Sequence, residues 1–235
     1  MAYVSSGVAC SHVPALGVAA DTGISGDDYY GPIFEGFEFS RRWMENEKPD
    51  LVFLVYNDHC TAFDARVIPT FALGCAAEYS PADEGWGPRP VPLVKGHQQM
   101  SAHIAQSLIL DSFDITIMNE LEVDHGLTVP LTMLFGQPDA WPCRVVPLAV
   151  NVVQYPAPLG SRCYALGKAI RKAIDSFDED LKVCVFGTGG MSHQLPPQRA
   201  GLVNSEWDER FMNLLVNEPH KGCQIEHIEL SLIHI

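Results

Sequence analysis

The sequence is short of positive charge. It holds 15 Lys and Arg residues against 29 Asp and Glu residues, which gives a formal net charge of −14 at pH 7. Nucleic acids and anionic membrane surfaces are bound through clusters of basic side chains. We therefore expect neither a nucleic-acid partner nor a membrane surface. A small anionic substrate is still compatible with this charge, because it needs only a local positive group.

Long apolar runs and paired cysteines are also missing. No apolar run reaches about 18 residues, the length that a membrane-spanning helix requires. The first residues lack the basic and apolar segments of an export signal. The seven cysteines form no Cys-x-x-Cys pair, which argues against a structural zinc site, and several lie inside apolar runs, as reduced core cysteines do. The cytoplasm is therefore the expected compartment.

Three common catalytic motifs are absent from the sequence. There is no Gly-x-Ser-x-Gly elbow, no phosphate-binding loop ending in Gly-Lys-Ser/Thr, and no His-Glu-x-x-His zinc helix. The composition, 47% apolar and 19% charged residues, is that of a folded globular protein. At 235 residues, the chain is long enough for one large domain with a full core.

Short β-branched runs alternate with helical patterns along the chain. We expect strands at residues 3–9, 51–56, 67–73, 115–118, 144–153 and 183–186. We expect helices at residues 33–45, 97–110, 129–135, 162–177 and 205–215, the last opened by a capping box at Ser205. This order predicts an α/β fold, a three-layer αβα sandwich around a mostly parallel or mixed sheet.

Two stretches rich in Gly and Pro are expected to be loops, at residues 13–32 and 77–96. A long loop in a compact domain is usually either functional or disordered. The second stretch contains Trp86 and Arg89, which favour a packed loop with a function, although a plain surface excursion explains the pattern equally well.

A histidine follows four of the apolar runs within a few residues. These are His12, His59, His125 and His193. Ligands of open α/β sheets bind beyond the carboxyl ends of the strands, so four imidazoles are expected at one edge of one sheet. Any single histidine after a strand is more often a hydrogen-bonded loop residue than a ligand. The recurrence therefore carries the prediction.

The residue types favour a metal site with acid–base partners. His12 and His59 are the best candidate ligands, with Asp58 as an acceptor for a ring N–H of His59. Two histidines and one carboxylate form the site of non-haem Fe(II) oxygenases, but the spacing does not single out the carboxylate. His193 follows a glycine-rich turn and is suited to take and return protons. His125 is suited to donate a proton or to hydrogen-bond a substrate oxygen.

Six stretches resemble the catalytic β subunit of protocatechuate 4,5-dioxygenase, a class III extradiol ring-cleaving dioxygenase. They are residues 11–17, 56–59, 68–72, 82–92, 123–126 and 187–195. The resemblance runs from about residue 3 to about residue 229. Gallate and methylgallate dioxygenases share these motifs, so the motifs are more specific for the family than for the substrate.

The resemblance implies an activity and roles for the histidines. His12 and His59 would bind Fe(II), His193 would be the catalytic acid–base, and His125 would lie beside the substrate and assist. The implied reaction is extradiol cleavage of protocatechuate by O₂ to 4-carboxy-2-hydroxymuconate semialdehyde. Gallate and 3-O-methylgallate are the alternative substrates.

The resemblance also implies a partner and a missing ligand. The β subunit of the family pairs with a small α subunit, whereas gallate dioxygenases carry an α-like part on the same chain. The third ligand of the family is a glutamate in a Gly-Ser-Glu-Gly stretch, which this sequence lacks. We therefore interpret residues 1–229 as one catalytic domain that is incomplete at its C-terminus, and residues 230–235 as a non-native tail. Such a chain is expected to bind iron weakly and to have little activity.

Two other classes of function compete with this interpretation. Some proteins of this fold are non-catalytic interaction scaffolds, although the presence of all four histidines argues against that role. A zinc hydrolase could use the same histidines. Oxygen consumption that depends on Fe(II) rather than on Zn(II) would distinguish the dioxygenase from both.

Overall fold

A six-stranded sheet forms the centre of the molecule. The computed structural model describes residues 1–193 and 201–225. The strand order is β1-β8-β2-β7-β3-β6. The strands are β1 (Tyr3–Cys10), β8 (Lys182–Thr188), β2 (Leu51–Tyr56), β7 (Arg144–Val150), β3 (Phe71–Gly74) and β6 (Thr116–Met118). The first four are mutually parallel, whereas β3 pairs antiparallel with β7 and carries β6 parallel to itself.

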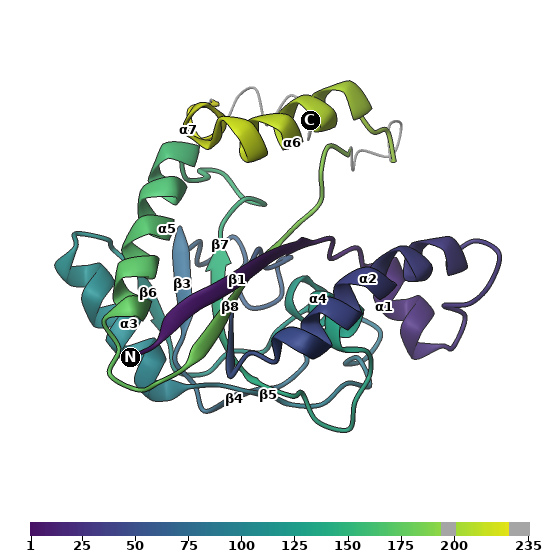
Figure 1. The fold of residues 1–235 in the computed structure, drawn as a ribbon, viewed down its shortest axis with the longest axis horizontal. Coiled ribbons are helices and arrows are strands. Elements are labelled where there is room, and N and C mark those ends of the chain that lie inside the picture. Colours follow the sequence, from purple (N-terminus) through teal and green to yellow (C-terminus); the bar gives the residue numbers. More distant parts are fainter. Residues whose placement is uncertain (194–200, 226–235) are drawn as a thin grey trace.

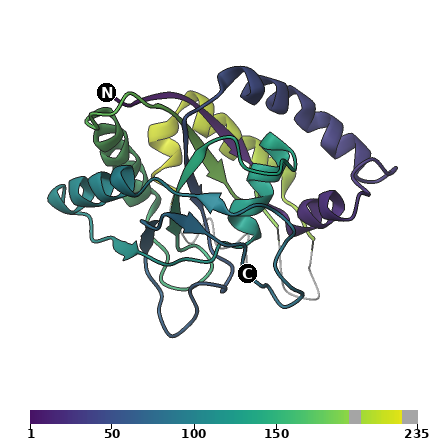
Figure 2. The same ribbon diagram turned by 90° about the horizontal axis from the view of Figure 1, so that it is seen from below.

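Helices cover both faces of this sheet, which confirms the predicted three-layer fold. On one face lie α3 (Gln98–Leu110) and α5 (Gly160–Asp175). On the other lie α1 (Pro14–Asp21), α2 (Gly31–Glu47) and α4 (His125–Phe135). The two groups stand on the left and on the right of the sheet in both views (Figures 1 and 2).

The central strand β2 contributes side chains to the hydrophobic cores on both faces of the sheet. Almost every residue of Leu-Val-Phe-Leu-Val-Tyr is buried, as expected for a parallel strand covered on both faces. Successive side chains of a strand point to opposite faces. Leu51 and Phe53 accordingly join the core under α3 and α5, while Val52, Leu54 and Tyr56 join the core under α1, α2 and α4.

Two further helices lie outside the sandwich. α6 (Ser205–Asn217) and α7 (Pro219–Gly222) lie above the sheet in Figure 1. Asn204 caps α6 by accepting a hydrogen bond from the Trp207 amide at 3.2 Å, so the capping box predicted at Ser205 is wrong by one residue. No helix among the residues that the structure describes is long and apolar enough to cross a membrane.

Both predicted loops contain regular structure. Residues 13–32 include α1, which begins at Pro14 because a proline fits the first turn of a helix. Residues 77–96 include a short antiparallel pair, β4 (Glu78–Tyr79) with β5 (Val94–Lys95). Two predicted strands were too long, since β3 begins only at Phe71 and β7 ends at Val150.

Candidate active site

Three of the four predicted histidines follow neighbouring parallel strands. His12 comes after β1, His59 after β2 and His193 after β8, and β8 lies between the other two. The carboxyl ends of these strands therefore meet at one edge of the sheet, where α/β proteins bind their ligands. This placement agrees with the sequence-based prediction.

His125 reaches the same edge by a different route. The strand before it, β6, runs opposite to β1, β2 and β8, so its carboxyl end points away from this edge. The chain returns through residues 119–124, and His125 is the first residue of α4, which packs against β2 and β8. The expectation that all four histidines end strands at this edge was therefore wrong for His125, because a helix N-terminus presents it.

The rings of His12, His59 and His125 form a tight cluster. Their centroids lie 4.9 Å apart for His12 and His59, 5.9 Å for His12 and His125, and 4.0 Å for His59 and His125, the last pair being stacked. His12 and His125 are buried, and His59 is half-buried. His193 is also half-buried, and its Nδ1 lies 2.9 Å from the carbonyl oxygen of Met191.

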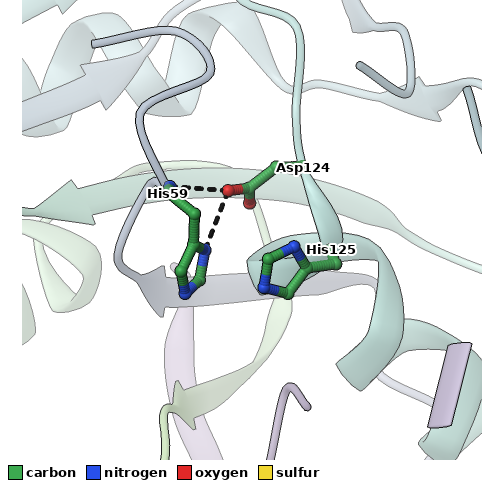
Figure 3. A group of neighbouring side chains, drawn as sticks. All are labelled: His59, Asp124 and His125. Carbon is green, nitrogen blue, oxygen red and sulfur yellow. Dashed lines mark hydrogen bonds and ion pairs between the residues drawn. The ribbon is translucent and has the colours of Figure 1, made fainter. Parts of the chain in front are cut away.

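Asp124 holds His59 in place. One carboxylate oxygen accepts the backbone N–H of His59 at 2.7 Å and lies 2.9 Å from its Nδ1 (Figure 3). The other oxygen accepts the Gly126 amide at 2.8 Å and so caps α4. Burial acts to raise the pKa of Asp124, but the hydrogen bond and charge of His59 outweigh it, and the pKa is lowered. Asp124 is therefore a carboxylate at neutral pH.

The carboxylate predicted to support His59 was the wrong one. Asp58 does not take this role, because its oxygens accept the backbone amides of Thr61, Ala62 and Phe63. Asp58 thus shapes the turn after His59. Asp124 lies 65 residues further along the chain, and local spacing gives no sign that the two meet.

His12 is held in the neutral form that binds metals. Its Nδ1 lies 3.2 Å from the Thr188 hydroxyl, which itself donates to the carbonyl oxygen of Gly126 at 3.2 Å. The hydroxyl oxygen is thus left to accept the proton on Nδ1. Burial, followed by the neighbouring His59 and His125, lowers the pKa of His12 to about 4. A neutral ring with an open Nε2 is the form in which histidine binds a metal.

Glu84 holds His125, and sequence reasoning missed it. One oxygen of Glu84 accepts the His125 backbone N–H at 2.9 Å, and the other pairs with its Nδ1. Glu84 belongs to the 77–96 stretch, in which the sequence had drawn attention to Trp86 and Arg89 instead. Trp86 is 75% exposed at the tip of this loop, whereas the side chain of Arg89 is only 9% exposed.

The three clustered imidazoles share one arrangement. Each has an oxygen at Nδ1, which leaves Nε2 as the atom that can face a ligand. For His59 this tautomer has further support, because the side-chain amide of Asn57 lies 3.0 Å from Nε2 and can donate to it. A metal ion bound at this Nε2 would have to displace that amide. Imidazoles held in this way by outer oxygens fit a divalent transition metal.

A second set of possible metal ligands lies at the same site. One ligand atom each of His59, Asp124 and His125 lie within 4.8 Å of one another. However, the oxygens of Asp124 already accept three N–H groups, from His59 and Gly126. Asp124 therefore acts better as an outer support of His59 than as a ligand itself, and the imidazoles are the stronger donors.

A buried ion pair fixes the loop that carries Glu84. Arg89 bonds Asp21 of α1 at 2.8 Å and the hydroxyl groups of Thr128 and Thr132 of α4. Replacing Arg89 with alanine removes the charged partner of Asp21 and leaves its carboxylate with only the Gln137 side-chain amide, at 2.6 Å. Breaking a buried ion pair in this way costs about 3–5 kcal/mol. Urea unfolding should show this loss of stability. Arg66→Ala, which breaks a fully exposed pair with Asp64, serves as the control and should change little. An equal loss in both variants would contradict the structural role of Arg89.

Comparison with known proteins places this geometry in a family. Residues 6–234 match the family model described as the catalytic LigB subunit of aromatic ring-opening dioxygenase. The chain belongs to this family. The motif-based recognition of a ring-cleaving dioxygenase family is thereby confirmed.

Two relatives of the chain carry different substrates in their names. The chain is 48% identical to the gallate dioxygenase of Pseudomonas putida over 152 residues, which is 65% of this chain and 45% of that protein. It is 32% identical over 188 residues to the 2,3-dihydroxyphenylpropionate/2,3-dihydroxicinnamic acid 1,2-dioxygenase of Mycolicibacterium paratuberculosis, covering 79% of this chain and 56% of that protein. The chain thus spans about half the length of these relatives. The boundary expected at residue 229 and the tail 230–235 lie outside the described residues.

Proposed function

We propose that the chain is the catalytic part of an extradiol dioxygenase that opens the ring of a carboxylated catechol with Fe(II) and O₂. One observation carries the proposal. Three imidazoles from β1, β2 and α4 cluster at the ligand-binding edge of the sheet, each with an oxygen at Nδ1. This arrangement occurs in a member of a ring-opening dioxygenase family.

Each histidine is assigned a separate role. His12 and His59 would hold the metal through Nε2, because both are fixed at strand ends and supported by oxygens of Thr188 and Asp124. A bound Fe(II) would supply coordination positions for the two catechol oxygens and for O₂. A third ligand, predicted to be a glutamate, has no counterpart in this assignment, since the carboxylates of Asp124 and Glu84 are already engaged with imidazoles.

His193 and His125 would act on protons of the substrate. His193 would accept the proton of a catechol hydroxyl and later return it, a task that suits the imidazole of a histidine. His125 would lie beside the substrate and hydrogen-bond one of its oxygens. The position of His193 after β8, which lies between the strands that precede His12 and His59, supports this division.

Gallate is the substrate that the comparisons favour. The gallate dioxygenase of Pseudomonas putida shares 48% of the aligned residues, whereas the sequence motifs alone led to protocatechuate. Gallate carries one more ring hydroxyl than protocatechuate. We expect the highest kcat/KM for gallate in oxygen-consumption assays that compare gallate, protocatechuate and 3-O-methylgallate. A clear preference for protocatechuate would return the substrate to the original prediction.

Dependence on the metal tests the reaction class. Fe(II) added without oxygen and followed by substrate and O₂ should support oxygen uptake, whereas Zn(II) should not, because zinc has no redox chemistry. Activity with Zn(II), or uptake without added or bound iron, would favour another class of enzyme. A small α-type subunit stays a prediction, which co-purification would test. An α-like part of the same chain is the alternative prediction.

A further inference from the structure

A single carboxylate makes two hydrogen bonds to one of the site's histidines. Glu84 accepts the backbone N–H of His125 with one oxygen and pairs with the ring Nδ1 with the other. Its side chain is only 12% exposed, and that of His125 only 9%. Both bonds are therefore largely sheltered from water, which strengthens them and makes the loss of either partner costly.

The backbone around Glu84 is itself fixed. Two residues earlier, the Ala82 amide donates to the Val123 carbonyl, and the Val123 amide donates to the Ser80 carbonyl, both at 2.9 Å. These bonds tie the loop to the segment that leads into His125. On the other side, Asp83 accepts the amides of Gly85 and Gly87, whose positive φ angles of 104° and 90° close the turn. The Glu84 carboxylate therefore comes from a closed turn that is hydrogen-bonded to the segment leading into His125.

We propose that Glu84 is the positioning residue of His125. By accepting at Nδ1, it keeps the proton of the neutral ring on that nitrogen and turns Nε2, with its lone pair, toward the site. It also fixes the first residue of α4, so that the ring stacks on His59 at 4.0 Å. This proposal rests on the proposed function, in which His125 hydrogen-bonds the substrate, and it makes His125 an acceptor for a substrate hydroxyl.

Two carboxylates bind different backbone amides at the N-terminus of α4. Asp124 caps the helix at Gly126 and orients His59, while Glu84 binds the His125 amide and orients the His125 ring. The two stacked rings are therefore set by separate residues from separate segments. It follows that His125 can be released without releasing His59, which makes the proposal testable on its own.

The test uses nitrogen NMR of the metal-free chain, at a pH where His125 is neutral. The ring signals of His125 are identified by their absence in His125→Gln. In the parent protein the proton should be on Nδ1. In Glu84→Ala, a substantial share should move to Nε2, while Glu78→Ala, which removes an exposed ion pair with Lys95 in the same segment, should leave the signals unchanged. A proton on Nε2 in the parent, or no change in Glu84→Ala, would overturn the proposal.

A conservative variant covers the case in which Glu84→Ala does not fold. Glutamine at position 84 can accept from only one of the two N–H groups, because its other terminal atom is a donor. Glu84→Gln should therefore either shift the ring proton to Nε2 or speed the hydrogen exchange of the His125 backbone amide. If neither changes, Glu84 does not position His125. These readings need no turnover, so they stand or fall separately from the dioxygenase assignment.

Discussion

Replacing His59 with alanine should sharply lower the affinity of the chain for Fe(II). His59 is the candidate ligand with the most complete support, since Asp124 fixes both its backbone and its Nδ1. Loss of an outer partner of a metal ligand typically costs roughly 10–100-fold in affinity. Removal of the ligand itself should cost more than that. Calorimetric titration with Fe(II) under anaerobic conditions measures the affinity directly.

A matched histidine variant shows whether the effect belongs to the site. His103 lies on α3, away from the cluster, and bonds the Ala173 carbonyl of α5 and the hydroxyl of Ser176, the residue that caps α5. His103→Ala should retain the affinity of the parent protein for Fe(II). If His59→Ala binds Fe(II) as well as His103→Ala does, His59 is not a ligand.

Replacing His193 with phenylalanine should separate metal binding from turnover. We expect the affinity for Fe(II) to be unchanged, because His193 is assigned to protons rather than to the metal. The rate of ring opening should fall by roughly 10²–10⁴-fold, the usual contribution of a positioned general acid or base. Metal titration and product formation, measured on the same preparation, test both halves of this expectation.

The control for His193→Phe changes an exposed histidine in the same way. His220 lies on α7, where its Nδ1 is 3.1 Å from the hydroxyl of Tyr164. His220→Phe should leave both metal affinity and turnover close to those of the parent. An unchanged turnover in His193→Phe would remove the proton-transfer role from His193, and a loss of metal would make His193 a ligand.

The sequence alone predicted the sheet edge because strand patterns are local. β1, β2 and β8 were each visible as short apolar runs, and a histidine follows each of them. The general rule that α/β proteins bind ligands at strand ends then predicted one edge of the sheet for His12, His59 and His193. No knowledge of the strand order was needed for that step.

The supporting residues could not be predicted because they come from distant parts of the chain. Asp124 meets His59 across 65 residues, and Glu84 meets His125 across 41. The reversed direction of β6 was hidden for the same reason, since direction depends on strand pairing. Asp58 was chosen only because it precedes His59 in the sequence. Successive side chains of an extended chain point to opposite sides, so a neighbour in sequence need not meet the His59 ring.

Labelled oxygen gives the most direct test of the proposed reaction. The protein would be loaded with Fe(II) and given gallate and isotopically labelled O₂, and the mass of the ring-opened product would be measured. A dioxygenase places both atoms of O₂ in its product, so a gain of two labelled atoms is expected. An opened ring with no label would mean that water attacks the substrate, and the assignment of this site to a ring-opening dioxygenase would be wrong.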